Sequence, residues 1–81
     1  MYETTDRTLE QVEEQIRQRD FVNLRKHLLL LEPAHIADLL IELHREDQAV
    51  VFRLLPKEIA ILTFEHLPAW AQEEILKSLG D

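Results

Sequence analysis

The sequence contains no cysteine, a single glycine, three prolines and no long hydrophobic run. Without cysteine, the chain can form neither a disulfide framework nor a thiolate zinc site. Its longest apolar runs, at residues 28–31, 49–52 and 59–64, the last of which contains Thr63, are far shorter than the roughly 20 residues that a helix needs to cross a bilayer. Residues 1–20 are dense in charge and lack the apolar centre of a signal peptide. We therefore expect no direct membrane insertion of this segment.

The residues that are present favour helices and an acidic surface. Hydrophobic residues make up 46% of the chain, and the net charge is −7. Residues 1–30 hold six acids and five bases, whereas residues 31–81 hold ten acids and four bases, so the acidity lies in the second part. Such a surface repels a phosphate backbone, which argues against nucleic-acid binding. A cation or a basic partner is its natural electrostatic counterpart, although an excess of acid is more often simply typical of a soluble surface.

A leucine recurs every twelve residues in the second part of the chain, at Leu31, Leu43, Leu55, Leu67 and Leu79. Twelve residues at about 100° each leave an offset of about 120°, so these leucines would not share one face of a continuous helix. We therefore expect each helix to end and a new helix to begin between these leucines. Proline stands one or two positions after the leucine in three of the four blocks, where it suits the first position of a new helix.

We predict about six short helices in one domain over residues 8–81, preceded by a flexible lead-in at 1–7. Thr8 and Gln11 form a capping box for a first helix over residues 9–19, and Asp20 is the N-cap of a second over 21–30. The remaining helices are expected to start at Pro33, around Arg45–Asp47, at Pro56 and at Pro68. Gly80 is expected at the C′ position that ends the last helix.

Helical spacing also predicts which side chains face inward. The expected inward residues of the last four helices are Ile36, Leu39, Leu40, Leu43, Val50, Val51, Leu54, Leu55, Ile59, Leu62, Ala71, Ile75, Leu76 and Leu79. In the helix after Pro56, Ile61 and Phe64 are further candidates for the apolar face, and this wide face predicts a central helix with contacts on two sides. Rods about 15 Å long cannot form a long four-helix bundle, so they must stack as in a solenoid.

No catalytic constellation is present, because the chain has one serine, Ser78, and neither a phosphate-binding glycine loop nor an HExxH motif. We therefore do not expect this chain to be an enzyme. Glu42, Glu46 and Asp47 cluster around a predicted turn, where they either hold a hydrated cation or meet a partner, or are solvated helix-end acids. Trp70 either anchors a partner interface or packs against a neighbouring helix.

Three stretches carry a resemblance to a known family. Residues 31–40 read LEPAHIADLL, residues 51–56 read VFRLLP, and the block from Leu67 to Leu79 repeats the leucine-proline opening with Glu73 and Glu74 inside it. In these stretches the chain resembles the intracellular amino-terminal domain of the MgtE family of magnesium transporters and channels. The resemblance covers residues 20–79. Flagellar motor switch proteins carry similar repeats of short helices.

The resemblance implies a right-handed superhelix and a regulatory role. It implies that the segment is part of a longer membrane protein, on the cytoplasmic face of the cell membrane. There CBS domains and a dimeric transmembrane domain would be its partners. Mg²⁺ bound between the acidic domain and the CBS domains would screen repelling carboxylates and keep the pore closed. Magnesium favours oxygen ligands and keeps several waters, so one or two carboxylates on each side suffice.

The chain departs from the family in the block that starts at Pro56. Leu62 stands where the family usually has an acid that faces the CBS domains. Glu58 and Glu65 are the nearby carboxylates that remain as candidate magnesium ligands. The alternative function is a metal-independent helical scaffold for protein interaction, such as a flagellar motor switch-like adaptor.

Overall fold

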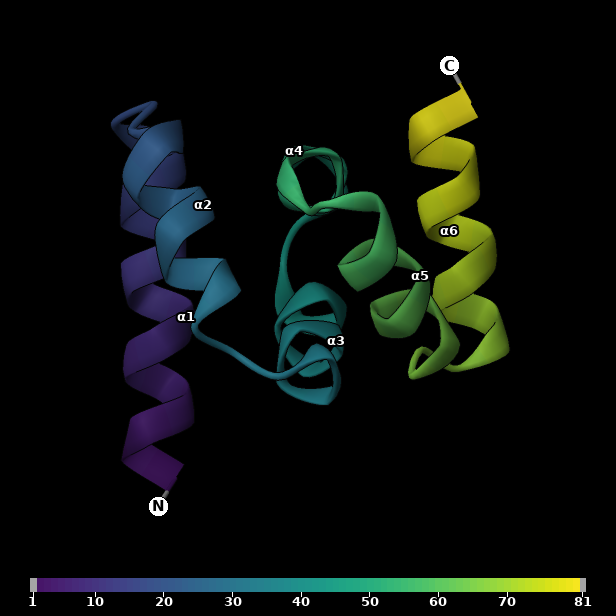
Figure 1. The fold of residues 1–81 in the computed structure, drawn as a ribbon, viewed down its shortest axis with the longest axis horizontal. Coiled ribbons are helices and arrows are strands. Elements are labelled where there is room, and N and C mark those ends of the chain that lie inside the picture. The colour runs from purple at the N-terminus through teal and green to yellow at the C-terminus, as the bar shows by residue number, and fades with distance from the viewer. Residues whose placement is uncertain (1, 81) are drawn as a thin grey trace.

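The computed structural model describes residues 2–80, and the side chains of residues 7–80, as short helices joined by tight turns (Figure 1). The helices are α1 (Tyr2–Arg17), α2 (Phe21–Leu29), α3 (Pro33–Glu42), α4 (Arg45–Leu54), α5 (Lys57–Glu65) and α6 (Ala69–Gly80). The predicted all-α class is confirmed over this described part of the chain. The right-handed sense of the superhelix stays a prediction.

The first helix differs most from its predicted limits. It begins at Tyr2 instead of Leu9 and ends at Arg17, so much of the stretch predicted as a lead-in is helical. Thr8 lies inside α1 with 7% of its surface exposed, and the capping box predicted from Thr8 and Gln11 was therefore wrong. The sequence pattern failed here because the residues before Thr8 are polar and show no apolar period.

The turn between α1 and α2 is closed by hydrogen bonds at both helix ends. The N–H groups of Arg19 and Asp20 donate to the carbonyls of Ile16 and Gln15, which is the Schellman pattern of a helix end. Asp20 is the N-cap of α2, as predicted, and its carboxylate accepts from the Asn23 N–H at 3.5 Å and from the Asn23 Nδ2 at 2.8 Å. These bonds hold α1 and α2 as an antiparallel hairpin.

The leucines of the twelve-residue ladder mark the turns. Bends between consecutive helices contain Leu31, Leu43, Leu55 and Leu67. Leu43 and Leu55 are extended C-cap residues whose N–H groups bond back to Leu40 and Phe52 at 3.2 Å. Apart from Leu31, which is half-buried, these turn leucines have at most 7% of their surface exposed. Each turn is therefore anchored to the core by its leucine.

The helices after α1 stack in two rows. One row is α3 on α5, and the other is α2, α4 and α6, with α1 packed against α2 (Figure 1). The pairs α3–α4 and α5–α6 are equivalent units, because the Nε2 of Gln48 donates to the Leu40 carbonyl and that of Gln72 donates to the Phe64 carbonyl, in each case eight residues earlier. The structural repeat is thus a helix pair built from two of the twelve-residue blocks.

The core is centred on α3, and α5 and α6 contribute fewer buried side chains to it. Ile36, Leu39 and Leu40 have at most 1% of their surface exposed, as the spacing predicted. Val50 and Leu54 are half-buried, and Leu54 packs against the core. By contrast, Leu62 and Leu76 are 46% and 57% exposed, so their predicted inward orientation was wrong. These positions lie on faces that no further helix covers within the described residues.

Two further predictions about the second unit were wrong. α5 has the predicted contacts on two sides, with α3 and, through the Gln72–Phe64 hydrogen bond, with α6. It is not the predicted central helix, since Thr63 is its one fully buried residue and its apolar face is partly open to solvent. Gly80 is the last helical residue of α6, without a positive φ, and does not stand at a left-handed C′ position. The left-handed residue of the described chain is Arg19, with φ 58°.

Candidate functional site

The candidate magnesium ligands lie on the exposed side of α5. Glu58, Leu62 and Glu65 are spaced i, i+4 and i+7, which places them along one side of the helix. All three side chains are exposed. The two carboxylates are separated by about 10 Å along the helix axis at 1.5 Å per residue, which suits two contacts with a facing surface better than one shared ion. Leu62 interrupts this acidic stripe at its midpoint.

A second group of acids surrounds the turn between α3 and α4. Glu42 and Glu46 are exposed, and Asp47 is half-buried in the first turn of α4, where its charge suits the helix dipole. The pKa of Arg17 is raised mainly by its hydrogen bond and ion pair with Glu14, and Asp47 adds a smaller contribution. The structure thus brings the end of α1 near the start of α4.

Most of the acidic charge in the second part of the chain has no basic partner. Glu74 lies 3.9 Å from the guanidinium of Arg45, and no other acid of residues 31–80 forms an ion pair with the described side chains. No group of three or more histidine or acidic side chains within the described residues converges as a metal centre. The excess negative charge is therefore free to meet ions or a partner from outside.

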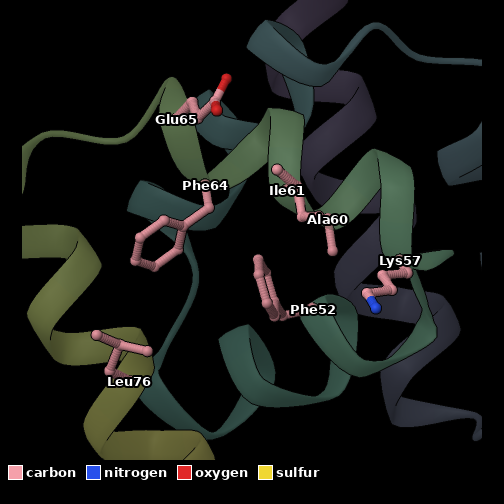
Figure 2. Close-up of a pocket in the computed structure, with 7 residues that line it drawn as sticks. All are labelled: Phe52, Lys57, Ala60, Ile61, Phe64, Glu65 and Leu76. Carbon is pink, nitrogen blue, oxygen red and sulfur yellow. The ribbon is translucent and has the colours of Figure 1, made fainter.

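An apolar groove adjoins the acidic stripe. It has a volume of about 360 Å³ and is lined by Phe52, Ala60, Ile61, Phe64 and Leu76, with Lys57 and Glu65 at its two ends; we call this set the apolar groove. The rings of Phe52 and Phe64 meet edge to face with centroids 6.2 Å apart. Figure 2 shows the two rings and Leu76 turned toward one another, with Lys57 and Glu65 at opposite ends of α5.

The sequence alone did not predict the groove. Its residues carry the apolar spacing of a core face, and what distinguishes them is that no helix in the described residues covers them. Positions one unit earlier show the contrast: Ala37 is 1% exposed, whereas its counterpart Ile61 is 51% exposed. Trp70, a candidate interface residue, is 54% exposed on α6.

Comparison with known proteins gives one family. Residues 31–81, well over half of the chain, match a family model described as the MgtE intracellular N domain. The match covers α3 to α6 and leaves the α1–α2 hairpin outside it. Neither a curated protein nor a solved structure matches the chain. No helix within residues 2–80 combines the length and the apolar character that a bilayer crossing requires.

Proposed function

Because the chain belongs to the MgtE intracellular N domain family, we propose that it is the cytosolic regulatory domain of a magnesium transporter or channel. Its partners in the complete protein are the CBS domains and the transmembrane domain, in a homodimer on the cytoplasmic face of the membrane. The family match is the observation that carries this proposal. The family is one of transporter domains, and the proposed role involves no catalysis.

The charge distribution supports a magnesium-dependent mechanism. The matched residues 31–81 hold ten acids against four bases, and the acids among the described residues 31–80 are largely unpaired. Bringing this surface against another acidic domain costs electrostatic energy, which divalent cations reduce. Hydrated Mg²⁺ held by one or two carboxylates of each domain would therefore favour a compact arrangement, and its loss would favour an open one. Glu58 and Glu65 are the proposed contributions of α5.

The acidic stripe provides the experiment. Replacing Leu62 by glutamate completes a row of three carboxylates at i, i+4 and i+7, so like-charge repulsion should lower stability by about 0.2–0.5 kcal/mol for each neighbouring pair. Because binding to the folded state stabilises it, millimolar MgCl₂ should then raise the melting temperature more than NaCl of equal ionic strength. The increment should be larger in Leu62→Glu than in the parent chain.

Leu30→Glu is the matched control, because Leu30 is 83% exposed and has no acid within four residues on its own face. This control should show the same magnesium increment as the parent chain. An equal magnesium increment in Leu62→Glu, in Leu30→Glu and in the parent chain would mean that α5 carries no magnesium-sensitive stripe. Loss of the parent increment in Glu58→Gln plus Glu65→Gln would identify the two carboxylates as its source.

The groove favours a second candidate function, a metal-independent scaffold that binds a partner helix. In the groove, half-buried aromatic rings lie beside the exposed aliphatic side chains of Ile61 and Leu76, and apolar grooves of this kind commonly bind helices. Magnesium separates the two proposals, since the scaffold predicts partner binding that does not change when magnesium is replaced by sodium at equal ionic strength.

A further inference from the structure

The exposed apolar side chains gather at the two ends of the stacked helices. At one end, α2 and its C-cap residue present three apolar side chains, Val22, Leu29 and Leu30, which are 68%, 44% and 83% exposed. At the other end lie Ile61 and Leu76 of the apolar groove, 51% and 57% exposed. Figure 1 shows α2 and α6 at opposite ends, with α3 and α4 between them, so the two apolar surfaces cannot meet within one molecule.

The two ends also differ in charge. α2 holds Arg25 and Lys26 and no acid, which makes it the one described helix with a net positive charge. Residues 57–80, which form α5 and α6, hold four acids and two lysines. A basic helix therefore meets an acidic surface when the ends of two molecules approach, and charge complementarity of this kind steers association and fixes its register.

The exposed face of α2 has the spacing of a groove-binding helix. Val22, Lys26 and Leu29 follow at i, i+4 and i+7, with Leu30 beside them; we call these four residues the α2 face. Arg25 is already engaged, because its Nε donates to the Leu54 carbonyl at 3.2 Å. Lys26 makes no ion pair with the described side chains and is the base free to approach a partner.

We propose that the apolar groove of one copy receives the α2 face of a second copy, with Lys26 of the incoming helix paired with Glu65 at the groove end. The leucines of the α2 face enter between Phe64 and Leu76 and remove these side chains from water, which supplies the driving force. Since the two contacting surfaces differ, the contact is heterologous, and it extends head to tail instead of stopping at a symmetric dimer.

The test is sedimentation equilibrium of the 81-residue chain in magnesium-free buffer, which keeps the test independent of the proposed magnesium role. The proposed contact involves few side chains on each copy and should be weak, so concentrations up to about 1 mM are needed. The weight-average mass should rise above the 9.6 kDa of one chain as the concentration increases. Lys26→Glu and Glu65→Lys should each remain monomeric. An equimolar mixture of the two variants should associate again, because each contact then joins a glutamate to a lysine.

Three variants complete the design. Ile61→Asp places a charge in the groove at a half-exposed position, so the fold is kept and association should be lost. Arg7→Glu and Glu10→Lys make the same charge changes on exposed positions of α1 and should associate like the parent chain. A parent chain that stays monomeric throughout the concentration range would overturn the proposal. So would association that survives in Ile61→Asp, or a mixture of the two charge variants that stays monomeric.

Discussion

At the scale of single residues, one turn places a non-glycine residue in a backbone conformation that glycine normally adopts. Arg19 stands at the C′ position of α1 with φ 58°, in the left-handed region that glycine adopts without strain. The only glycine of the chain, Gly80, lies in a regular helix instead. Arg19 is exposed and its side chain makes no ion pair with the described residues. The turn is held by its two backbone hydrogen bonds, and the arginine side chain contributes little to it.

Replacing Arg19 by glycine should therefore stabilise the chain. Relief of the left-handed strain is worth about 1–2 kcal/mol, and the greater flexibility of glycine in the unfolded chain takes back about 0.5–1 kcal/mol. We expect a net gain of about 0.5–1 kcal/mol in the free energy of unfolding, measured by urea denaturation with an unchanged slope. Arg17→Gly is the contrast, because Arg17 has helical geometry and pairs with Glu14, so glycine there should destabilise. A gain at both positions would refute the strain argument.

At the scale of elements, two glutamines repeat the same contact in successive helix pairs. Gln48 of α4 donates to the Leu40 carbonyl at 2.7 Å, and Gln72 of α6 donates to the Phe64 carbonyl at 2.9 Å. Both carbonyls lie near the end of the preceding helix, where intrahelical partners run out. Gln48 is only 4% exposed, whereas Gln72 is half-buried. The same hydrogen bond therefore joins the two helices of each pair, but it is shielded from water in the α3–α4 pair and partly open to water in the α5–α6 pair.

Replacing each glutamine by methionine, which has nearly the same shape but no hydrogen-bond donor, measures how much each contact contributes to stability. Gln48→Met should lower the free energy of unfolding by about 1 kcal/mol, because the Leu40 carbonyl loses a buried donor and keeps only the Leu43 N–H. Gln72→Met should cost about half as much, since water can replace the lost donor at Phe64. Chemical denaturation of both variants measures the difference. Equal losses would mean that burial does not decide the value of the contact.

The element scale also shows what the sequence could predict. Pro33, Pro56 and Pro68 set the starts of three helices correctly to within one residue, because proline fixes φ locally. The inward orientation of Ile36, Leu39 and Leu40 was predictable for a similar reason, since spacing alone places them on one face. The exposure of Leu62 and Leu76 was not, because it depends on whether another helix covers that face. Both the apolar groove and the exposure of the acidic stripe result from the lack of a covering helix within the described residues, which spacing in the sequence does not reveal.

At the scale of the whole molecule, stability is unevenly distributed along the stack. α3 has four buried residues, whereas α5 has one and α6 has two. Stacked repeats gain stability from each neighbour, so a unit covered on one side alone is the first to open. A chain of this size has a total stability of about 4–12 kcal/mol at roughly 0.05–0.15 kcal/mol per residue, so partial opening of the last pair is energetically accessible.

Amide hydrogen exchange should resolve this gradient. The amides of α3 and α4 should exchange by global unfolding, and those of α6 by a lower-energy local opening. Leu40→Ala and Ile75→Ala form a matched pair, since both side chains are at most 1% exposed and such truncations cost about 2–5 kcal/mol. Leu40→Ala should lower protection in every helix, because α3 lies at the centre of the core. Ile75→Ala should lower it chiefly in α6, where the lost packing affects the terminal unit and its contact with α4. Equal loss of protection in all helices for both variants would show that the stack opens as one cooperative unit. In that case the apolar groove would open only when the whole chain unfolds.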